Sequence, residues 1–172
     1  MSKESNPFVR LAEEAVKKYI IEHKIMRPPE DLPSEMKERG GVFVSLKKNK
    51  RLRGCIGTFI PTRDSIAEEI IQNAISSATK DPRFPPVTIK EIEELEYSVD
   101  LLSPPEPVSD VKDLDPKRYG VIVKNGDKRG LLLPDLDGVD TVSKQIEIAK
   151  QKADISKDEE IELFRFEVKR YR

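Results

Sequence analysis

The sequence predicts an α+β fold built from two copies of one unit, a hairpin followed by a helix and a strand. Apolar residues alternate with polar ones over the expected strands and recur at helical spacing between them. An Arg-Gly pair opens the second hairpin strand of both copies, at Arg53-Gly54 and at Arg129-Gly130. Hairpins with long returns favour an antiparallel or mixed sheet with helices on one face. We therefore expect an internally duplicated α+β architecture.

In the first half, a helix is expected over about 6–22, with Asn6 as its N-cap and Pro7 at the first helical position. Residues 24–40 then read as a surface loop. The first repeat covers about 41–102. It comprises strands at 41–46 and 52–59, a helix that Asp64 can cap, a short helix with a Thr88–Glu91 capping box, and a half-buried strand from Leu95.

In the second half, a proline-rich linker is expected over 103–116 and the second repeat over about 119–171. Its hairpin has strands at 119–124 and 128–133 around an Asn125-Gly126 turn of type I′. Thr141 can cap the following helix, twelve residues after Arg129, while Asp64 lies eleven residues after Arg53. In the last strand the apolar residues change from odd positions to even positions, a shift of one residue that predicts a β-bulge near Leu163.

Length and composition predict one soluble domain over residues 1–172. Thirty-one basic and thirty-two acidic side chains leave a net charge of −1, which argues against bulk electrostatic capture of nucleic acid or an anionic membrane. A single cysteine, no apolar signal core over residues 1–10 and no bilayer-length apolar run predict a cytoplasmic location. Scarce Asn and Gln beside abundant Lys, Glu and Ile favour a thermophilic source.

The candidate site begins on the strand that holds the only cysteine. Alternation predicts that Arg53, Cys55 and Gly57 share a face, with Gly54 and Gly57 letting a ligand or another backbone approach closely. Arg53 would hold a carboxylate or phosphate and would lower the pKa of the Cys55 thiol. The alternative is that Cys55 is a small core residue and that the glycines mark a bulge or tight packing. The second copy favours this alternative, because Leu131 stands where the first copy has Cys55.

The second candidate is the loop Asp81-Pro82-Arg83-Phe84-Pro85-Pro86. Three prolines reduce the entropy lost in holding Arg83 and Phe84 in one pose, which suits recognition. The alternative is an Asp81–Arg83 pair that only anchors the loop.

Few residues of this sequence could form other kinds of catalytic or metal site. The one histidine, His23, lies near a helix end, so a Cys/His zinc site or a Ser-His-Asp triad is not expected. No glycine-rich phosphate loop occurs, and no cofactor or metal is predicted, although an all-carboxylate Mg²⁺ or Ca²⁺ site stays open. The basic run 47–53 reads as a solvated hairpin tip or, alternatively, as a contact for nucleic acid or an acidic partner.

The string LRGCIGTF at 52–59 resembles the hallmark motif of the AMMECR family. The loop 81–86, the strand at 97–103 and the Leu-Leu-Leu-Pro segment at 131–134 are similar to further family features, so the resemblance covers about residues 8–171. It implies a duplicated α+β fold with a barrel-like sheet and no established reaction. It also implies that Arg53, Gly54, Cys55 and Gly57 matter, and that prokaryotic members act beside a Memo-type protein and a radical-SAM protein.

Three functional hypotheses follow. The first is a binding or accessory module with a cleft between the 53–57 strand and the 81–86 loop, recognising an anionic or planar ligand or partner. Its site residues would be Arg53, Gly54, Gly57, Asp81, Arg83 and Phe84. The second is an enzyme that uses Cys55 as nucleophile or thiol acceptor. The third is nucleic-acid binding through the basic 47–53 hairpin, with affinity that falls steeply with salt.

Overall fold

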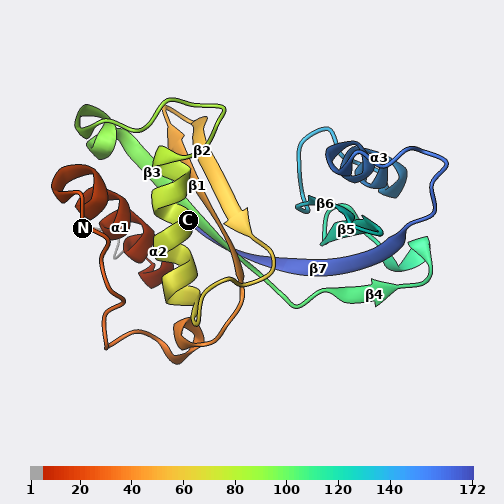
Figure 1. Ribbon diagram of the computed structural model, residues 1–172, viewed down its shortest axis with the longest axis horizontal. Helices are drawn as coiled ribbons and strands as arrows, with labels where there is room; N and C mark the ends of the chain where they lie inside the picture. The colour runs from red at the N-terminus through yellow and green to blue at the C-terminus, as the bar shows by residue number, and fades with distance from the viewer. Residues whose placement is uncertain (1–5) are drawn as a thin grey trace. The chain divides into compact units, whose positions relative to one another are not determined.

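The computed structural model describes residues 6–172 and divides the chain into two compact units. The first unit ends at Leu102 and also includes Lys169–Arg172, while the second unit is Ser103–Val168 (Figure 1). Half of the amino-terminal segment predicted to lack a signal core, residues 1–5, lies outside the described residues. Over the described chain, no helix combines the length and apolar character needed to cross a bilayer.

The first unit opens with helix α1 (Pro7–Glu22), as the sequence predicts. The Asn6 side chain accepts a hydrogen bond from the Phe8 amide, and Pro7 occupies the first turn, where no backbone donor is needed. The apolar face of α1 is buried, and the helix ends at His23 in a left-handed conformation. The following loop contains one short 3₁₀ helix, η1 (Ser34–Lys37).

The sheet of the first unit has strand order β2-β1-β3, and both strand pairs are antiparallel. Its strands are β1 (Gly41–Lys48), β2 (Arg51–Thr58) and β3 (Leu95–Leu102). Asn49 and Lys50 both have positive φ, which is typical of a type I′ turn, between β1 and β2. Helix α2 (Ile66–Thr79) packs on β1 and β2, over alternate residues of β1, namely Val42, Val44 and Leu46. Helix α1 packs on α2 and β3 (Figure 1).

Helix α2 (Ile66–Thr79) is capped by Ser65, so the prediction of Asp64 as its cap is wrong. Ser65 Oγ accepts from the Glu68 amide at 3.2 Å, whereas the Asp64 amide donates to the Glu68 carboxylate at 3.1 Å. Serine and aspartate are equally good caps, so local sequence does not separate two adjacent candidates. The capping box of Thr88 and Glu91 is confirmed at η2 (Ile89–Glu94).

The second unit carries more regular structure than the sequence predicted. The expected linker contains β4 (Glu106–Val108) and η3 (Val111–Asp113), and β4 pairs with β7 (Glu162–Tyr171). Pro107 is compatible with β4 because the strand pairs on one side only, and an edge strand tolerates a missing donor. The other elements are β5 (Tyr119–Asn125), β6 (Lys128–Leu132) and α3 (Val142–Ala153), capped by Thr141 as predicted.

Two predictions for this unit are wrong in detail. Asn125 pairs with Lys128, so the hairpin loop is 126–127, and of these two residues Gly126 alone has positive φ, as in a type II′ turn. The register of β5 on β7 is continuous, so no bulge occurs at Leu163. The apolar phase changes because β7 packs on both faces: Leu163 contacts the core of the second unit, and the Phe166 ring covers Gly120 on the other face.

The two units repeat one order of elements, hairpin, helix and strand, with strand orders β2-β1-β3 and β6-β5-β7. With Ser65 as the cap, the capping residue follows the Arg-Gly arginine by twelve residues in the first unit, and Thr141 does the same in the second. All strand pairs described are antiparallel. The predicted α+β class, an antiparallel sheet flanked by helices, is confirmed.

Candidate functional site

A β-bulge on β2 decides where the motif side chains point. Leu46 pairs with Gly54 and Lys47 pairs with Leu52, so Arg53 is the extra residue. Cys55 pairs with Ser45, which lies on the face of β1 away from Val44 and Leu46. Gly54 lies on the Leu46 face, and Arg53 binds the same Glu91 as Lys48, which alternates onto that face of β1. The prediction that Arg53 and Cys55 share a face is therefore wrong, because the bulge resets the alternation.

Arg53 is held by Glu91 in a two-pronged ion pair. Arg53 Nε and Nη2 donate to the two Glu91 oxygens at 3.0 and 3.1 Å, and 12% of the Arg53 side chain is exposed. Glu91 also accepts from Lys48 Nζ and from the Thr88 amide of the capping box. The hydrogen bonds from Arg53 are the main cause that lowers the pKa of Glu91 to about 2. Arg53 thus fixes the start of η2.

Cys55 is half-buried, and its burial favours the thiol form. Ser45 Oγ donates to Cys55 Sγ at 3.2 Å. Burial raises the pKa of Cys55, and this outweighs the opposite effects of the Ser45 hydrogen bond and of the Arg83 charge. A nucleophilic thiolate is not favoured by this environment.

The loop 81–86 is in direct contact with β2 through Asp81. One Asp81 oxygen accepts from the Cys55 amide at 3.0 Å, and the carboxylate also accepts from the amide, Nε and Nη2 of Arg83. Arg83 Nη2 reaches the Cys55 carbonyl at 3.4 Å. Only 3% of the Asp81 side chain is exposed, and the hydrogen bonds from Arg83 hold the pKa of its carboxyl far below the usual range.

Arg83 and Phe84 form the outward part of this loop. The Arg83 side chain is 56% exposed, and its guanidinium lies 5.4 Å from the centroid of the half-buried Phe84 ring. The Phe84 amide donates to the Asp81 carbonyl at 3.2 Å, and the Val87 amide donates to the Ala78 carbonyl at 2.8 Å. The loop is therefore tied to itself, to β2 and to the end of α2.

Other parts of the protein occupy the space beside the two motif glycines, Gly54 and Gly57. A Cβ at Gly54 would overlap the Ser77 carbonyl oxygen of α2, and a Cβ at Gly57 would overlap the ring of its cross-strand partner Phe43. Both positions thus serve close packing of a helix and a ring on β2, the alternative that the sequence left open.

A polar row on α2, which was not predicted from the sequence, also shapes the site. Its members lie one turn apart and reach the β1–β2 hairpin: buried Glu69 accepts from Thr58 Oγ1 at 2.6 Å, Asn73 donates to the Val42 carbonyl at 3.0 Å, and Ser77 Oγ accepts from the Ile56 amide at 2.9 Å. Asp81 continues the same spacing. The signal was present as polar residues at every fourth position beside an apolar stripe.

The basic hairpin tip is partly neutralised. Lys48 Nζ lies 3.4 Å from Glu91 and 3.2 Å from Glu94, while Lys47, Lys50 and Arg51 are exposed. Among residues 6–172, no group of three or more His, Cys, Asp or Glu side chains has the arrangement of a metal site.

The fold and the motif strand define an α+β protein with an arginine-anchored, proline-rich loop, and comparison with known proteins identifies the family. The family model AMMECR1 matches residues 9–171. This chain belongs to the AMMECR1 family, as its motif residues predict.

Relatives and a solved structure agree with this assignment. A Thermotoga maritima protein is 51% identical over 97% of this chain and 98% of its own length. A Clostridium acetobutylicum protein is 47% identical over 98% of this chain, which spans 36% of that protein. The crystal structure of the uncharacterized protein PH0010 from Pyrococcus horikoshii matches with a TM-score of 0.87 and 34% identity, over 95% of this chain and 88% of that one. Thermophilic relatives, including one from Thermococcus gammatolerans, support the predicted thermophilic source.

Proposed function

We propose that this protein is a binding or accessory module that presents the loop 81–86 as its recognition element. The observation that carries the proposal is that the LRGC strand anchors both ends of the loop. The Cys55 backbone binds Asp81 at the start, and Arg53 binds Glu91, which caps η2 through Thr88 just after the end. Between these anchors Arg83 remains largely exposed.

This arrangement is suited to an anionic or planar ligand or partner. A guanidinium presents donors in a fixed plane to carboxylates and phosphates, and it also stacks on flat groups. The Phe84 ring beside it adds an apolar wall. Because three prolines and the Asp81 hydrogen bonds hold the loop before binding, little conformational entropy is lost on recognition.

The site residues divide into two roles in this proposal. Arg83 and Phe84 would touch the ligand, on the outer side of the loop. Arg53, Gly54, Gly57 and Asp81 would position the loop, together with the Cys55 backbone. A cytoplasmic location and partnership with a Memo-type protein and a radical-SAM protein belong to the same proposal, since they rest on the resemblance and on composition.

The test uses phenyl phosphate, which combines a planar ring with a dianion, as the probe in an NMR titration. We expect shifts in the Arg83 side chain and the Phe84 amide, and weaker shifts with inorganic phosphate or phenol alone. Arg83→Gln should weaken binding at least about tenfold, because a charge-assisted hydrogen bond is lost. Arg51→Gln, an exposed arginine outside the loop, is the matched control.

A second variant separates recognition from loop folding. Arg83→Lys keeps the charge but loses the planar fork, so we expect intermediate binding with the amide spectrum of the loop retained. Equal binding by the wild type, Arg83→Gln and Arg83→Lys, or shifts confined to other elements, would overturn the proposal.

A further inference from the structure

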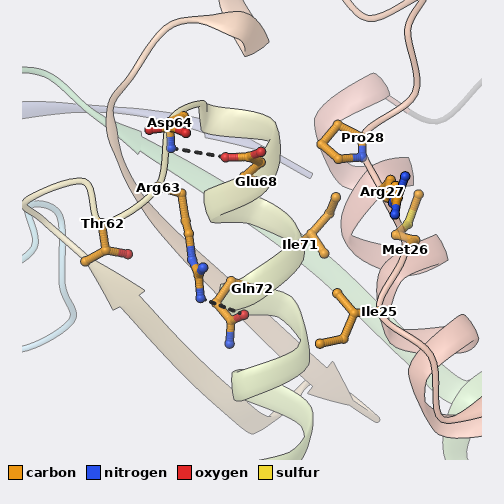
Figure 2. Close-up of a pocket in the computed structure, with 10 residues that line it drawn as sticks. All are labelled: Ile25, Met26, Arg27, Pro28, Thr62, Arg63, Asp64, Glu68, Ile71 and Gln72. Carbon is orange, nitrogen blue, oxygen red and sulfur yellow. Dashed lines mark hydrogen bonds between the residues drawn. The ribbon is translucent and has the colours of Figure 1, made fainter.

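A cavity lies on different elements from the loop 81–86. It has a volume of about 400 Å³, within the range of small-molecule sites. The segment after α1 supplies one wall, and the start of α2 with the residues before it supplies the other (Figure 2). All ten lining residues belong to the first unit.

One side of this cavity is mostly apolar, and Arg27 is the charged residue on it. Ile25, Met26 and Pro28 come from the segment after α1, and Ile71 comes from α2; Figure 2 shows Ile25 and Ile71 on the same side of the helix. Ile71 is buried, whereas 61% of Ile25 is exposed. An exposed isoleucine beside a buried one provides an apolar wall that a ligand side chain could cover.

The polar lining separates its charges along α2. Asp64 and Glu68 lie at the start of the helix, while the Arg63 side chain runs along it to Gln72, whose Oε1 accepts from Arg63 Nη2 at 3.2 Å (Figure 2). Asp64 and Glu68 therefore form a negative end and Arg63 a positive end. In the described residues no ion pair joins these side chains to each other or to Arg27, which also lines the cavity.

The spacing of these ends indicates the size of the complementary ligand. Glu68 and Gln72 are four residues apart, which is about 6 Å along a helix. A single α-amino acid is too short to span this distance, whereas two extended residues cover about 7 Å between their ends. We infer that the cavity binds a free dipeptide, or a zwitterion of that length, with an apolar side chain. Its ammonium group would lie by Asp64 and Glu68, its carboxylate by Arg63, and its side chain against Ile25 and Ile71.

This inference is independent of the proposed role of Arg83, and its test uses other probes. Leu-Leu is compared by isothermal titration calorimetry with N-acetyl-Leu-Leu, Leu-Leu-amide and leucine. Blocking either end should weaken binding at least about tenfold, because one charge-assisted interaction is lost each time. Isoleucine methyl NMR should place the shifts at Ile25 and Ile71.

Substitutions identify which residue binds which end of the dipeptide. Arg63→Gln should remove the preference for a free carboxylate, and Glu68→Gln should reduce the preference for a free amine while keeping an acceptor for the Asp64 amide. Ile25→Ala should weaken all dipeptides, and since Ile25 is exposed this change leaves folding intact. Arg51→Gln is the control. Equal affinity for the free and blocked peptides, no binding at millimolar Leu-Leu, or shifts away from Ile25 and Ile71 would overturn the inference.

Discussion

At the scale of single residues, the side chains that suggest chemistry have structural partners. Arg53 pairs with Glu91, Asp81 pairs with Arg83 and the Cys55 amide, and the Cys55 thiol accepts from Ser45. Arg83 alone of the predicted site side chains combines a charge with large exposure. The motif strand therefore organises a neighbouring loop, and the loop presents the exposed groups.

Alkylation of Cys55 provides the first test at this scale. Because burial raises the pKa of the thiol, we expect iodoacetamide to modify the folded protein more slowly than the urea-unfolded protein at pH 8. Mass spectrometry follows the reaction without ambiguity, since the chain has one cysteine. Faster labelling of the folded protein, with a midpoint at lower pH than in urea, would instead favour the enzyme hypothesis.

The ion pair of Arg53 and Glu91 provides a pH test. The folded-state pKa of Glu91 is about 2, below the ordinary value of 4.5, so the unfolded chain binds the proton first as the pH falls. The stabilisation is fully present above about pH 4.5 and is lost as the pH falls towards 2. We expect Glu91→Gln to lower the free energy of unfolding by about 2 kcal/mol at pH 7 and to flatten its fall in acid.

Urea unfolding followed by circular dichroism between pH 2 and 7 measures this effect. Glu14→Gln, at an exposed position of α1, is the matched control and should follow the wild type. If Glu91→Gln and the wild type lose stability in parallel over this range, the assigned pair does not carry the acid sensitivity.

At the scale of elements, helix ends depend on which of two neighbouring polar residues caps them. Asp64 and Ser65 both have cap chemistry, and the structure selects Ser65. The selection leaves Asp64 free to line the cavity at the start of α2. A shift of one residue in a cap thus changes which carboxylates a cavity contains.

Substitution of each residue by alanine separates the two cap candidates. Ser65→Ala removes the acceptor for the Glu68 amide and should lower the free energy of unfolding by about 1 kcal/mol. Asp64→Ala should change it by less than about 0.5 kcal/mol, because its side chain caps nothing. Chemical denaturation measures both. A larger loss in Asp64→Ala than in Ser65→Ala would restore the cap predicted from sequence.

At the scale of the whole molecule, the two copies share one way of packing a helix on a hairpin. A Cβ at Gly54 would overlap a carbonyl oxygen of α2, and a Cβ at Gly130 would overlap the Ala149 carbonyl oxygen of α3. Gly57 and Gly120 repeat a second feature, since each is covered by the ring of its cross-strand phenylalanine, Phe43 or Phe166. Close helix approach at the Arg-Gly pair is therefore a property of the repeated unit.

Alanine at Gly54 or Gly130 tests this shared packing. Since the overlap is with backbone atoms, which cannot move aside like a flexible side chain, each change should lower the free energy of unfolding by about 3 kcal/mol. Gly40→Ala is the control, because its Cβ would meet only the Ile66 side chain at 3.2 Å. Thermal and urea unfolding give the comparison. Losses no greater than that of Gly40→Ala would show that the helices can move away from the strands.

Local chemistry made much of the fold predictable. The cap of α1, the capping box of η2, the repeated hairpin-helix-strand order and the choice of motif strand and loop all depend on residues a few positions apart. The segment 103–116 was predicted to be a linker, and the bulge at Arg53 was not predicted. Both depend on residues distant in sequence, through the pairing of β4 with β7 and the register of β1 on β2.

The sequence by itself determined most of the elements, their duplication, and the motif strand and loop. Only the tertiary structure decided that Arg53 pairs with Glu91 and that Arg83 remains exposed. It also decided that helix α2 and a phenylalanine ring occupy the space beside Gly54 and Gly57. The physical reason is the distance along the chain between the residues that interact. Caps, turns and periodicity are set by neighbours along the chain, whereas the partner of a charge and the neighbour of a glycine are set by contacts that exist only after the chain has folded.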